Sequence, residues 1–299
     1  MRPPADVAVL VSPAAGRGRA GVLAGDVLAA FSSAGLAPRL LPATTGAEGQ
    51  RQVAQAVADG AVGVVAVGGD GTVHAALQAV AGTPVPLAVV PAGTGNDLVR
   101  ALGIPAHPLE AARAAAADLA AGEFRAIDAG RTGGRWWATV LCCGFDSAVS
   151  DRANRLRWPR GRRRYDVAVL AELARLRPRE FTLVLDGESH TLPVTMVAVG
   201  NTPWYGGGMK VCPGADPTDG LFDVTVVGAT SRLELIRTRP RLTLGTHVEH
   251  PMVTVHRAAR VELGSPGVAA YADGEPVAPL PAVAECVPGA LRILGAGRA

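Results

Sequence analysis

The chain has 299 residues, of which 48% are hydrophobic and 18% charged, so it can form two domains with sizeable cores. This composition excludes a chain that is disordered throughout, and a net charge of +3 gives no reason to expect nucleic acid as a partner. We expect a cytoplasmic protein, because the sequence has neither a run of 18 apolar residues nor a signal-peptide pattern.

The positions of the cysteines and the scarcity of lysine limit the kinds of binding site that the chain can form. None of the four cysteines belongs to a CxxC pair, which favours reduced structural thiols over a zinc site or disulfides. Lys210 is the only lysine, so no P-loop of the GxxxxGK[ST] type can occur. If the protein handles nucleotide phosphates, the glycine backbone, arginine and metal must hold them.

Apolar runs and stretches with helical spacing alternate along the first 125 residues. This alternation predicts a parallel sheet covered by helices on both faces, with ligands bound outside the carboxyl ends of its strands. The predicted elements are strand 6–12, helix 19–33, strand 37–41, helix 47–58, strand 62–67, helix 72–80, strand 85–90 and two helical stretches ending near residue 121.

From about residue 126 the sequence pattern changes to short strand-like runs separated by Gly, Pro and Asp turns. This pattern predicts an antiparallel β-sandwich. A helical insertion at 147–176 interrupts the strands, and a second helix follows Ser231, a predicted N-cap. We expect an α/β domain at 1–128 and a β-rich domain at 129–287, with a last strand within 288–299 that returns to the first domain. The predicted strands are 135–141, 181–186, 193–199, 221–227, 252–256, 260–263, 268–272, 283–287 and 291–294.

The segment GGDGT, residues 68–72, comes directly after a predicted strand. Its glycines would let a phosphate lie against main-chain N–H groups, and the start of the next helix would add partial positive charge. Asp70 would then bind Mg²⁺ or orient a reacting group. On this segment alone, a tight turn with Asp70 as the helix N-cap is an equally good interpretation.

A second loop, PAGTGNDLVR at residues 91–100, also follows an apolar strand. Two such loops at adjacent strand ends would form a polar cradle of the size of a phosphate group, which favours nucleotide binding. The residues that this loop would contribute are Gly93, Thr94, Asn96 and Asp97.

Five motifs occur in order along the chain: SPAAGRG (12–18), GGDGT (68–72), PAGTGNDLVR (91–100), PGADPTDGLFDV (213–224) and YADGE (271–275). Together they resemble the diacylglycerol kinase catalytic-domain family, and its soluble bacterial lipid kinases most closely. The resemblance covers nearly the whole chain. It implies an α/β nucleotide domain of the NAD-kinase and diacylglycerol-kinase type, a β-rich lipid-substrate domain, an active site in the cleft between them, and ATP with Mg²⁺.

The resemblance also implies roles for individual residues. Asp70 matches a catalytically required carboxylate near the γ-phosphate, and Glu275 matches the general base that accepts the proton of the acceptor hydroxyl. A magnesium site is implied at Asp216, Asp219 and the carbonyl of Leu221. The implied nucleotide contacts are Ser12, Pro13, Ala14, Ala15, Gly16, Arg17, Thr45, Gly68, Gly69, Asp70, Gly71, Thr72, Val73, His74 and Thr94.

Two positions depart from the pattern of the family: Ser12 stands where asparagine is usual, and His74-Ala75 where Asn-Glu is common.

We predict an ATP-dependent kinase that phosphorylates the hydroxyl of a diacylglycerol-like lipid. Two alternatives stay open. One is a kinase of the same fold acting on another lipid or on a soluble hydroxylated metabolite, and the other is a nucleotide-binding regulatory protein without catalysis.

The segment from Arg152 to Arg164 holds seven arginines around Trp158. It is either a solvated face or a surface attracted to anionic membrane, where each basic residue contributes roughly 1 kcal/mol. The second interpretation predicts peripheral association with a membrane that carries the lipid substrate. A homodimer is compatible with the sequence, and nucleic acid is not an expected partner.

Overall fold

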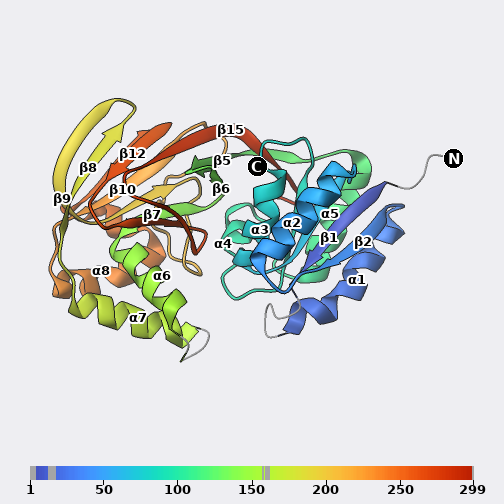
Figure 1. Cartoon of the computed structure of the whole chain (residues 1–299), viewed down its shortest axis with the longest axis horizontal. Helices are drawn as coiled ribbons and strands as arrows, with labels where there is room; N and C mark the ends of the chain where they lie inside the picture. Colours follow the sequence, from blue (N-terminus) through green and yellow to red (C-terminus); the bar gives the residue numbers. More distant parts are fainter. Residues whose placement is uncertain (1–4, 13–17, 157, 159–161, 298–299) are drawn as a thin grey trace. The chain divides into compact units, whose positions relative to one another are not determined.

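The computed structural model describes residues 5–12, 18–156, 158 and 162–297, and only the backbone of Arg162. The chain divides into two compact units, residues 1–129 with 288–299, and residues 130–287. It passes from one unit to the other in two strands, β5 (Arg125–Thr132) and β15 (Ala282–Leu294) (Figure 1). No helix of the described residues is long and apolar enough to cross a membrane.

The first unit is built on a parallel sheet with the strand order β2-β1-β3-β4, extended beyond β4 by the last residues of β15. Its strands are β1 (Asp6–Val11), β2 (Ala37–Pro42), β3 (Gly63–Gly68) and β4 (Leu87–Pro91). Its helices are α1 (Arg19–Ser33), α2 (Gly46–Ala58), α3 (Asp70–Val80), α4 (Asp97–Ala101) and α5 (Pro108–Ala121).

Both faces of this sheet are covered. Val7 and Val9 of β1 pack in one core with Phe31 of α1 and Ala115 of α5. Leu10 points to the opposite face and is buried as well. Because side chains alternate along a strand, burial of consecutive residues requires a layer on each face. The predicted α/β domain with a parallel sheet is therefore confirmed.

The second unit consists of antiparallel strands, which confirms the predicted class of its fold. Its longest complete strand, β9 (Glu188–Gly200), changes neighbours along its length: residues 188–194 pair with β8, and residues 196–200 lie between β7 and β10. The other strands are β6 (Arg135–Trp137), β7 (Val140–Gly144), β8 (Arg179–Leu185), β10 (Phe222–Gly228), β11 (Val253–Ala258), β12 (Arg260–Gly264), β13 (Ala269–Ala272) and β14 (Glu275–Pro279).

The alternation of side chains along β9 separates two cores in this unit. Val197 and Val199 face the larger one, where Trp137 stacks on Phe222 with 4.9 Å between ring centroids. Met196 on the other face packs in a smaller core that includes side chains of the helices. Phe145 and Leu242 are the helix residues of this smaller core. They belong to two of the helical segments of the unit, which are α6 (Phe145–Arg155), α7 (Arg162–Ala174), α8 (Arg232–Leu244) and the 3₁₀ turn Thr246–Glu249 (Figure 1).

Several predicted boundaries are wrong. The single helix predicted at 147–176 is two helices, because α6 ends at Arg155 and Leu156 is already extended. The strands predicted at 283–287 and 291–294 are one strand, β15, which continues through Pro288-Gly289 because Asp128 binds the Gly289 N–H at 2.8 Å. The strand predicted at 135–141 is two strands, β6 and β7.

Candidate active site

The two glycine-rich loops of the first unit touch one another. They follow β3 and β4, which are parallel neighbours in which Gly68 pairs with Pro91, so both loops leave the same edge of the sheet. A Cβ atom added to Gly93 would lie 2.5 Å from the Cα of Gly69, a distance at which the backbones would have to separate. Glycine is therefore required where the loops meet.

The carboxylate of Asp70 bridges these loops. The N–H of Asn96 donates to Oδ2 and the N–H of Asp97 donates to Oδ1, each at 3.2 Å. A Cβ on Gly95 would clash with Oδ2. Asp70 is the first residue of α3, whose N-cap is Gly69, so the interpretation of Asp70 as the N-cap of its own helix is wrong. It caps the start of α4 instead.

The side chains of the second loop hold its shape. Asn96 has a left-handed backbone (φ 54°), and its Nδ2 donates to the carbonyl of Gly93 at 3.1 Å. Asp97 is buried, and one of its oxygens accepts from Arg100 at 2.9 Å. The amides of both residues are thus held toward Asp70, while their side chains brace the loop and the short helix after it.

Other predicted nucleotide residues among those that the structure describes also follow the carboxyl ends of the parallel strands. Ser12 directly follows β1, and Thr45, after β2, caps α2 by accepting the Glu48 N–H at 3.2 Å. Gly68 passes so close to Thr72 that a Cβ there would clash with its side chain. His74 is buried in α3 with Gln78 3.3 Å away. Residues 13–17, predicted as Pro13, Ala14, Ala15, Gly16 and Arg17, lie outside the described residues.

In the second unit, the hairpin between β13 and β14 carries the two carboxylates of the YADGE motif. Asp273 has φ 52°, and its carboxylate accepts the N–H groups of Ala138 at 3.2 Å and Thr139 at 3.1 Å. These bonds explain why the predicted strand 135–141 breaks at Ala138-Thr139. Glu275 begins β14 and is exposed in its own unit. Of the two carboxylates, Glu275 is the one available to a substrate.

The loop predicted to bind magnesium contains an arginine contact. Oδ1 of Asp216 accepts the Thr218 N–H at 3.0 Å, and Oδ1 of Asp219 accepts the Leu221 N–H at 2.9 Å. The guanidinium of Arg257 contacts the other oxygen of Asp219. Within the described residues, no three Asp, Glu, His or Cys side chains are close enough together to hold a metal ion.

Arg257 also lies 3.5 Å from Asp223, which is buried behind this loop. Burial raises the pKa of the Asp223 carboxyl above its usual range, although the charge of Arg257 acts in the opposite direction. The arginine is therefore the positive charge that Asp219 and Asp223 share. A metal ion at Asp219 would compete with it.

Comparisons with known proteins agree with this arrangement in both units. The family model of the diacylglycerol kinase catalytic domain matches residues 6–132, and that of the YegS C-terminal NAD kinase beta sandwich-like domain matches residues 139–295. The chain is 43% identical to a diacylglycerol kinase of Mycobacterium tuberculosis over 96% of its own length and 94% of that protein. The chain belongs to the family of diacylglycerol kinases and YegS-like lipid kinases.

Other members of the family support the assignment. This lipid kinase is 33% identical to a Pseudomonas fluorescens protein named "Probable lipid kinase YegS-like", over 82% of its length and 81% of that protein. Its fold matches the crystal structure of a diacylglycerol kinase from Bacillus anthracis with a TM-score of 0.73 at 17% identity, covering 98% and 97% of the two chains. The family predicted from the motifs and the predicted enzyme class, a kinase, are confirmed.

The sequence did not predict one partly buried pair in this lipid kinase. Asp146 lies in the first turn of α6, directly after β7, and the hydroxyl of Tyr205 donates to its carboxylate. Burial raises the pKa of Asp146 to about 6 and that of Tyr205 well above its usual range. The available signal was the carboxylate in Gly144-Phe145-Asp146, at a strand-to-helix junction.

The raised pKa of Asp146 makes the stability of the protein depend on pH. Because the folded state holds this proton more tightly than the unfolded state, ionisation of Asp146 costs folding free energy between about pH 4 and pH 6, and the cost remains at higher pH. Asp146→Asn cannot ionise, and its amide oxygen can still accept from Tyr205. We expect the free energy of unfolding of the variant, relative to wild type, to rise from pH 4.5 to pH 7 in urea titrations.

The matched control is Asp26→Asn, which removes an exposed carboxylate from α1 in the other unit. Its unfolding curves report the general effect of losing one negative charge. If Asp146→Asn and wild type keep a constant difference across this pH range, the charge of Asp146 carries no folding cost.

Proposed function

We propose that this enzyme transfers the γ-phosphoryl group of ATP to the hydroxyl of a diacylglycerol-like lipid. The observation that carries the proposal is the Asp70 carboxylate, held between two touching glycine-rich loops at the carboxyl edge of a parallel sheet. Relatives named diacylglycerol kinase support the choice of acceptor.

In this proposal the loops bind the phosphates of ATP mainly through the backbone. Gly69 and Gly93 lack side chains where the loops meet, so phosphate oxygens can approach main-chain N–H groups there. Thr72 and Thr94 add hydroxyl groups, and the start of α3, an 11-residue helix, adds partial positive charge. No lysine is needed for this mode of binding, in keeping with a chain whose only lysine is Lys210.

The chemistry of transfer divides between two carboxylates. The acceptor oxygen forms a bond to the γ-phosphorus while the bond from this phosphorus to the ADP oxygen breaks, and the hydroxyl proton passes to Glu275 as general base. Asp70 acts on the phosphate side, where its fixed position orients the groups around the γ-phosphate. Positioning of this kind is the main contribution that a protein makes to phosphoryl transfer.

Magnesium fits the chemistry of the donors in the loop of residues 216–221, because carboxylate and carbonyl oxygens are its preferred ligands. We propose that Asp216, Asp219 and the Leu221 carbonyl hold it, with Arg257 displaced from Asp219. When bound, Mg²⁺ supplies positive charge to this loop.

The position of Asp70 can be tested through its neighbour Gly95. Gly95→Ala places a methyl group against Oδ2 of Asp70 and meets no backbone atom, so the carboxylate moves and the fold remains. We expect kcat to fall by about 10²-fold. In the double variant with Asp70→Asn, kcat should be no lower than in Asp70→Asn alone, because both changes act on the same carboxylate.

The control for this experiment is Gly25→Ala in α1, where the new methyl group meets nothing within 4 Å. Thermal unfolding of all variants shows whether the fold is kept. Additive losses of kcat in the double variant would mean that Gly95 acts independently of Asp70.

Substitutions of Glu275 and Asp70 separate the roles of the two carboxylates. Glu275→Gln should lower kcat by about 10²–10⁴-fold with little change in ATP affinity, because a general base acts only on the acceptor proton. Asp70→Asn should lower both kcat and the affinity for ATP. Turnover is measured with radiolabelled ATP on diacylglycerol, other lipids and soluble alcohols, which also identifies the acceptor.

Glu188→Gln is a matched control, because Glu188 follows an Asp-Gly pair in a hairpin of the same unit, as Glu275 does. Its side chain is 79% exposed. Glu275 is not the base if Glu275→Gln turns over the best acceptor as fast as Glu188→Gln does.

The proposed magnesium site can be tested at Arg257 and Asp219. Arg257→Gln removes the cation that competes for Asp219, so it should bind Mg²⁺ more tightly than wild type does in calorimetric titrations. Asp219→Asn should weaken binding. The metal is elsewhere if neither substitution changes the affinity.

A further inference from the structure

Helix α8 of the second unit carries apolar side chains on its outer surface. Leu233 is 55% exposed, Ile236 52% and Leu244 72%. They follow one another at spacings of three and eight residues, with the exposed Pro240 between them, and therefore lie along one stripe of the helix. None of the 13 residues of α8 is fully buried. The outer stripe is thus an unpartnered apolar face of this unit.

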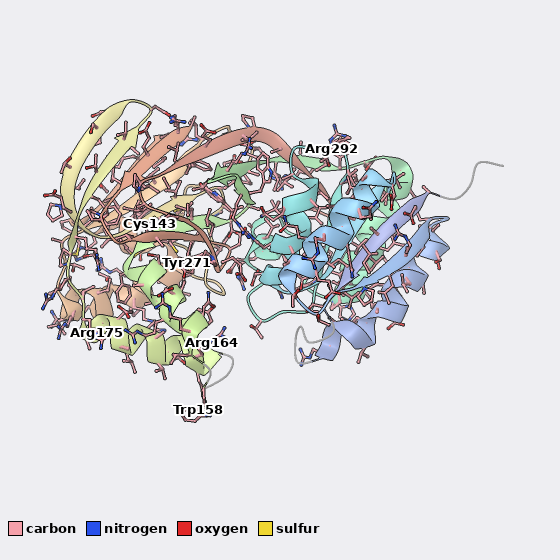
Figure 2. All side chains as sticks on the ribbon, viewed as in Figure 1. Cys143, Trp158, Arg164, Arg175, Tyr271 and Arg292 are labelled. Carbon is pink, nitrogen blue, oxygen red and sulfur yellow. The ribbon has the colours of Figure 1, made fainter. Side chains whose placement is uncertain are left out.

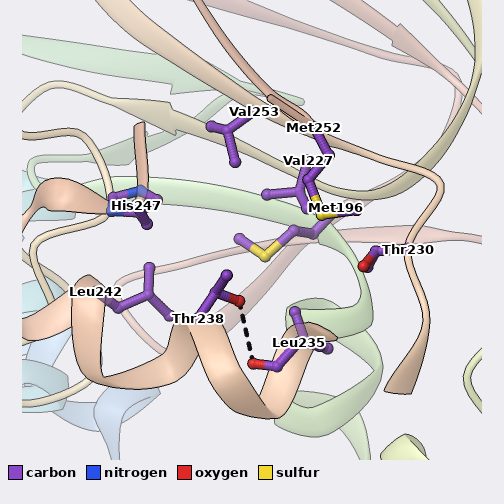
Figure 3. Close-up of a pocket in the computed structure, with 9 residues that line it drawn as sticks. All are labelled: Met196, Val227, Thr230, Leu235, Thr238, Leu242, His247, Met252 and Val253. Atoms are coloured by element: carbon purple, nitrogen blue, oxygen red, sulfur yellow. Dashed lines mark hydrogen bonds between the residues drawn. The ribbon is translucent and has the colours of Figure 1, made fainter. Parts of the chain in front are cut away.

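The inner side of α8 is docked on its own unit, so the outer stripe is not needed to hold the helix in place. Leu235 and Leu242 face the sheet across a cavity of only about 20 Å³, lined also by Met196 and Val227 (Figure 3). The helix begins at the Ser231 cap, and Glu234 pairs with His250 at 2.9 Å. A cavity of this size has room for a water molecule and for no ligand.

The charges around the stripe have one sign. Four exposed arginines lie on α8, and its only acid, Glu234, is engaged by His250. Within the described residues these arginines make no ion pair with an acid. A helix with Leu and Ile on its outer stripe and Arg beside it is typical of an element that lies in the surface of an anionic membrane. The arginines are Arg232, Arg237, Arg239 and Arg241.

A second exposed apolar group lies in and before α7. Trp158 is 82% exposed and Leu170 67%, and Trp158 projects away from the ribbon (Figure 2). Helix α7 packs on α6 through Ala168, and Phe145 of α6 packs in the same core as Leu242 of α8. The three helices form one layer, on the same side of the strands of this unit (Figure 1).

The arginine-rich segment predicted to contact a membrane contributes less charge than its sequence indicates. Arg152 pairs with Glu172, and Arg155 pairs with Asp151 at 3.0 Å. Residues 157 and 159–161 lie outside the described residues. Among the described side chains, α8 has four arginines without an ion pair to an acid, and this segment has two, Arg163 and Arg164.

We propose that the outer stripe of α8, extended by Leu170 and Trp158, docks this lipid kinase on the surface of an anionic bilayer. The arginines attract the lipid phosphates, and the apolar side chains enter the boundary of the acyl chains. A second copy fits this surface poorly, because a two-fold contact would place arginines opposite arginines. The proposal adds a partner to the proposed function and does not depend on which lipid is phosphorylated.

The test is co-sedimentation with vesicles of phosphatidylcholine alone and of phosphatidylcholine mixed with phosphatidylglycerol. We expect wild type to prefer the anionic vesicles. Arg232→Gln/Arg237→Gln should lose roughly fivefold in partitioning for each arginine. Leu233→Ser/Ile236→Ser should lose at least about tenfold on the same vesicles.

The matched controls lie in the first unit: Val22→Ser, where the side chain is 83% exposed on α1, and Arg51→Gln on α2. Both should partition as wild type does, and all variants should keep wild-type turnover on an acceptor dispersed in detergent. Loss of that turnover in every protein would count against the proposed function alone. Equal partitioning of the α8 variants and wild type would overturn the docking surface, and so would a wild-type dimer that Leu233→Ser/Ile236→Ser converts to a monomer.

Discussion

The two hydrogen bonds from the start of α4 to the Asp70 carboxylate fix the geometry of the first unit's candidate site. The first N–H groups of a helix have no partner within the helix, and Asp70 supplies acceptors for two of them. The bond pair forms only because Gly69 and Gly93 let the loops touch and Gly95 leaves room for the carboxylate. The loops are therefore set against one another by the fold, before any phosphate arrives.

The sequence predicted the layers of both units well, because the spacing of apolar residues along each segment indicates which of its faces are buried. Strands β1, β3 and β4 are continuous apolar runs, as strands covered on both faces must be. The errors occur where one contact overrides local preference. The residues Pro288-Gly289 predict the end of a strand, but β15 continues through them because Asp128 accepts the N–H of Gly289. The residues Ala138-Thr139 predict a continuous strand, but the strand breaks there because Asp273 accepts their N–H groups.

The sequence predicted that the two glycine-rich loops lie at neighbouring strand ends, but it did not predict which contacts the carboxylates of the motifs make. Asp186-Gly187-Glu188 and Asp273-Gly274-Glu275 build the same turn: each Asp has positive φ, and each carboxylate accepts two consecutive main-chain N–H groups of a neighbouring segment. The tripeptide therefore encodes a hairpin anchored by its aspartate. A catalytic role for Glu275 rests on its place in the YADGE motif, since the turn itself occurs twice.

The positions of the guanidinium groups give a physical reason for the nearly complete use of arginine in place of lysine. Some are neutralised by a carboxylate of their own unit, as Arg100 is by Asp97 and Arg257 by Asp219. Those of α8 lie beside exposed leucine and isoleucine with no acid to pair with in the described part of the chain. A guanidinium is weakly hydrated and matches the geometry of phosphate oxygens, so it can leave water beside an apolar stripe at a lower cost than an ammonium group can. The same side chain thus suits an ion pair within the fold and a phosphate-covered surface outside it.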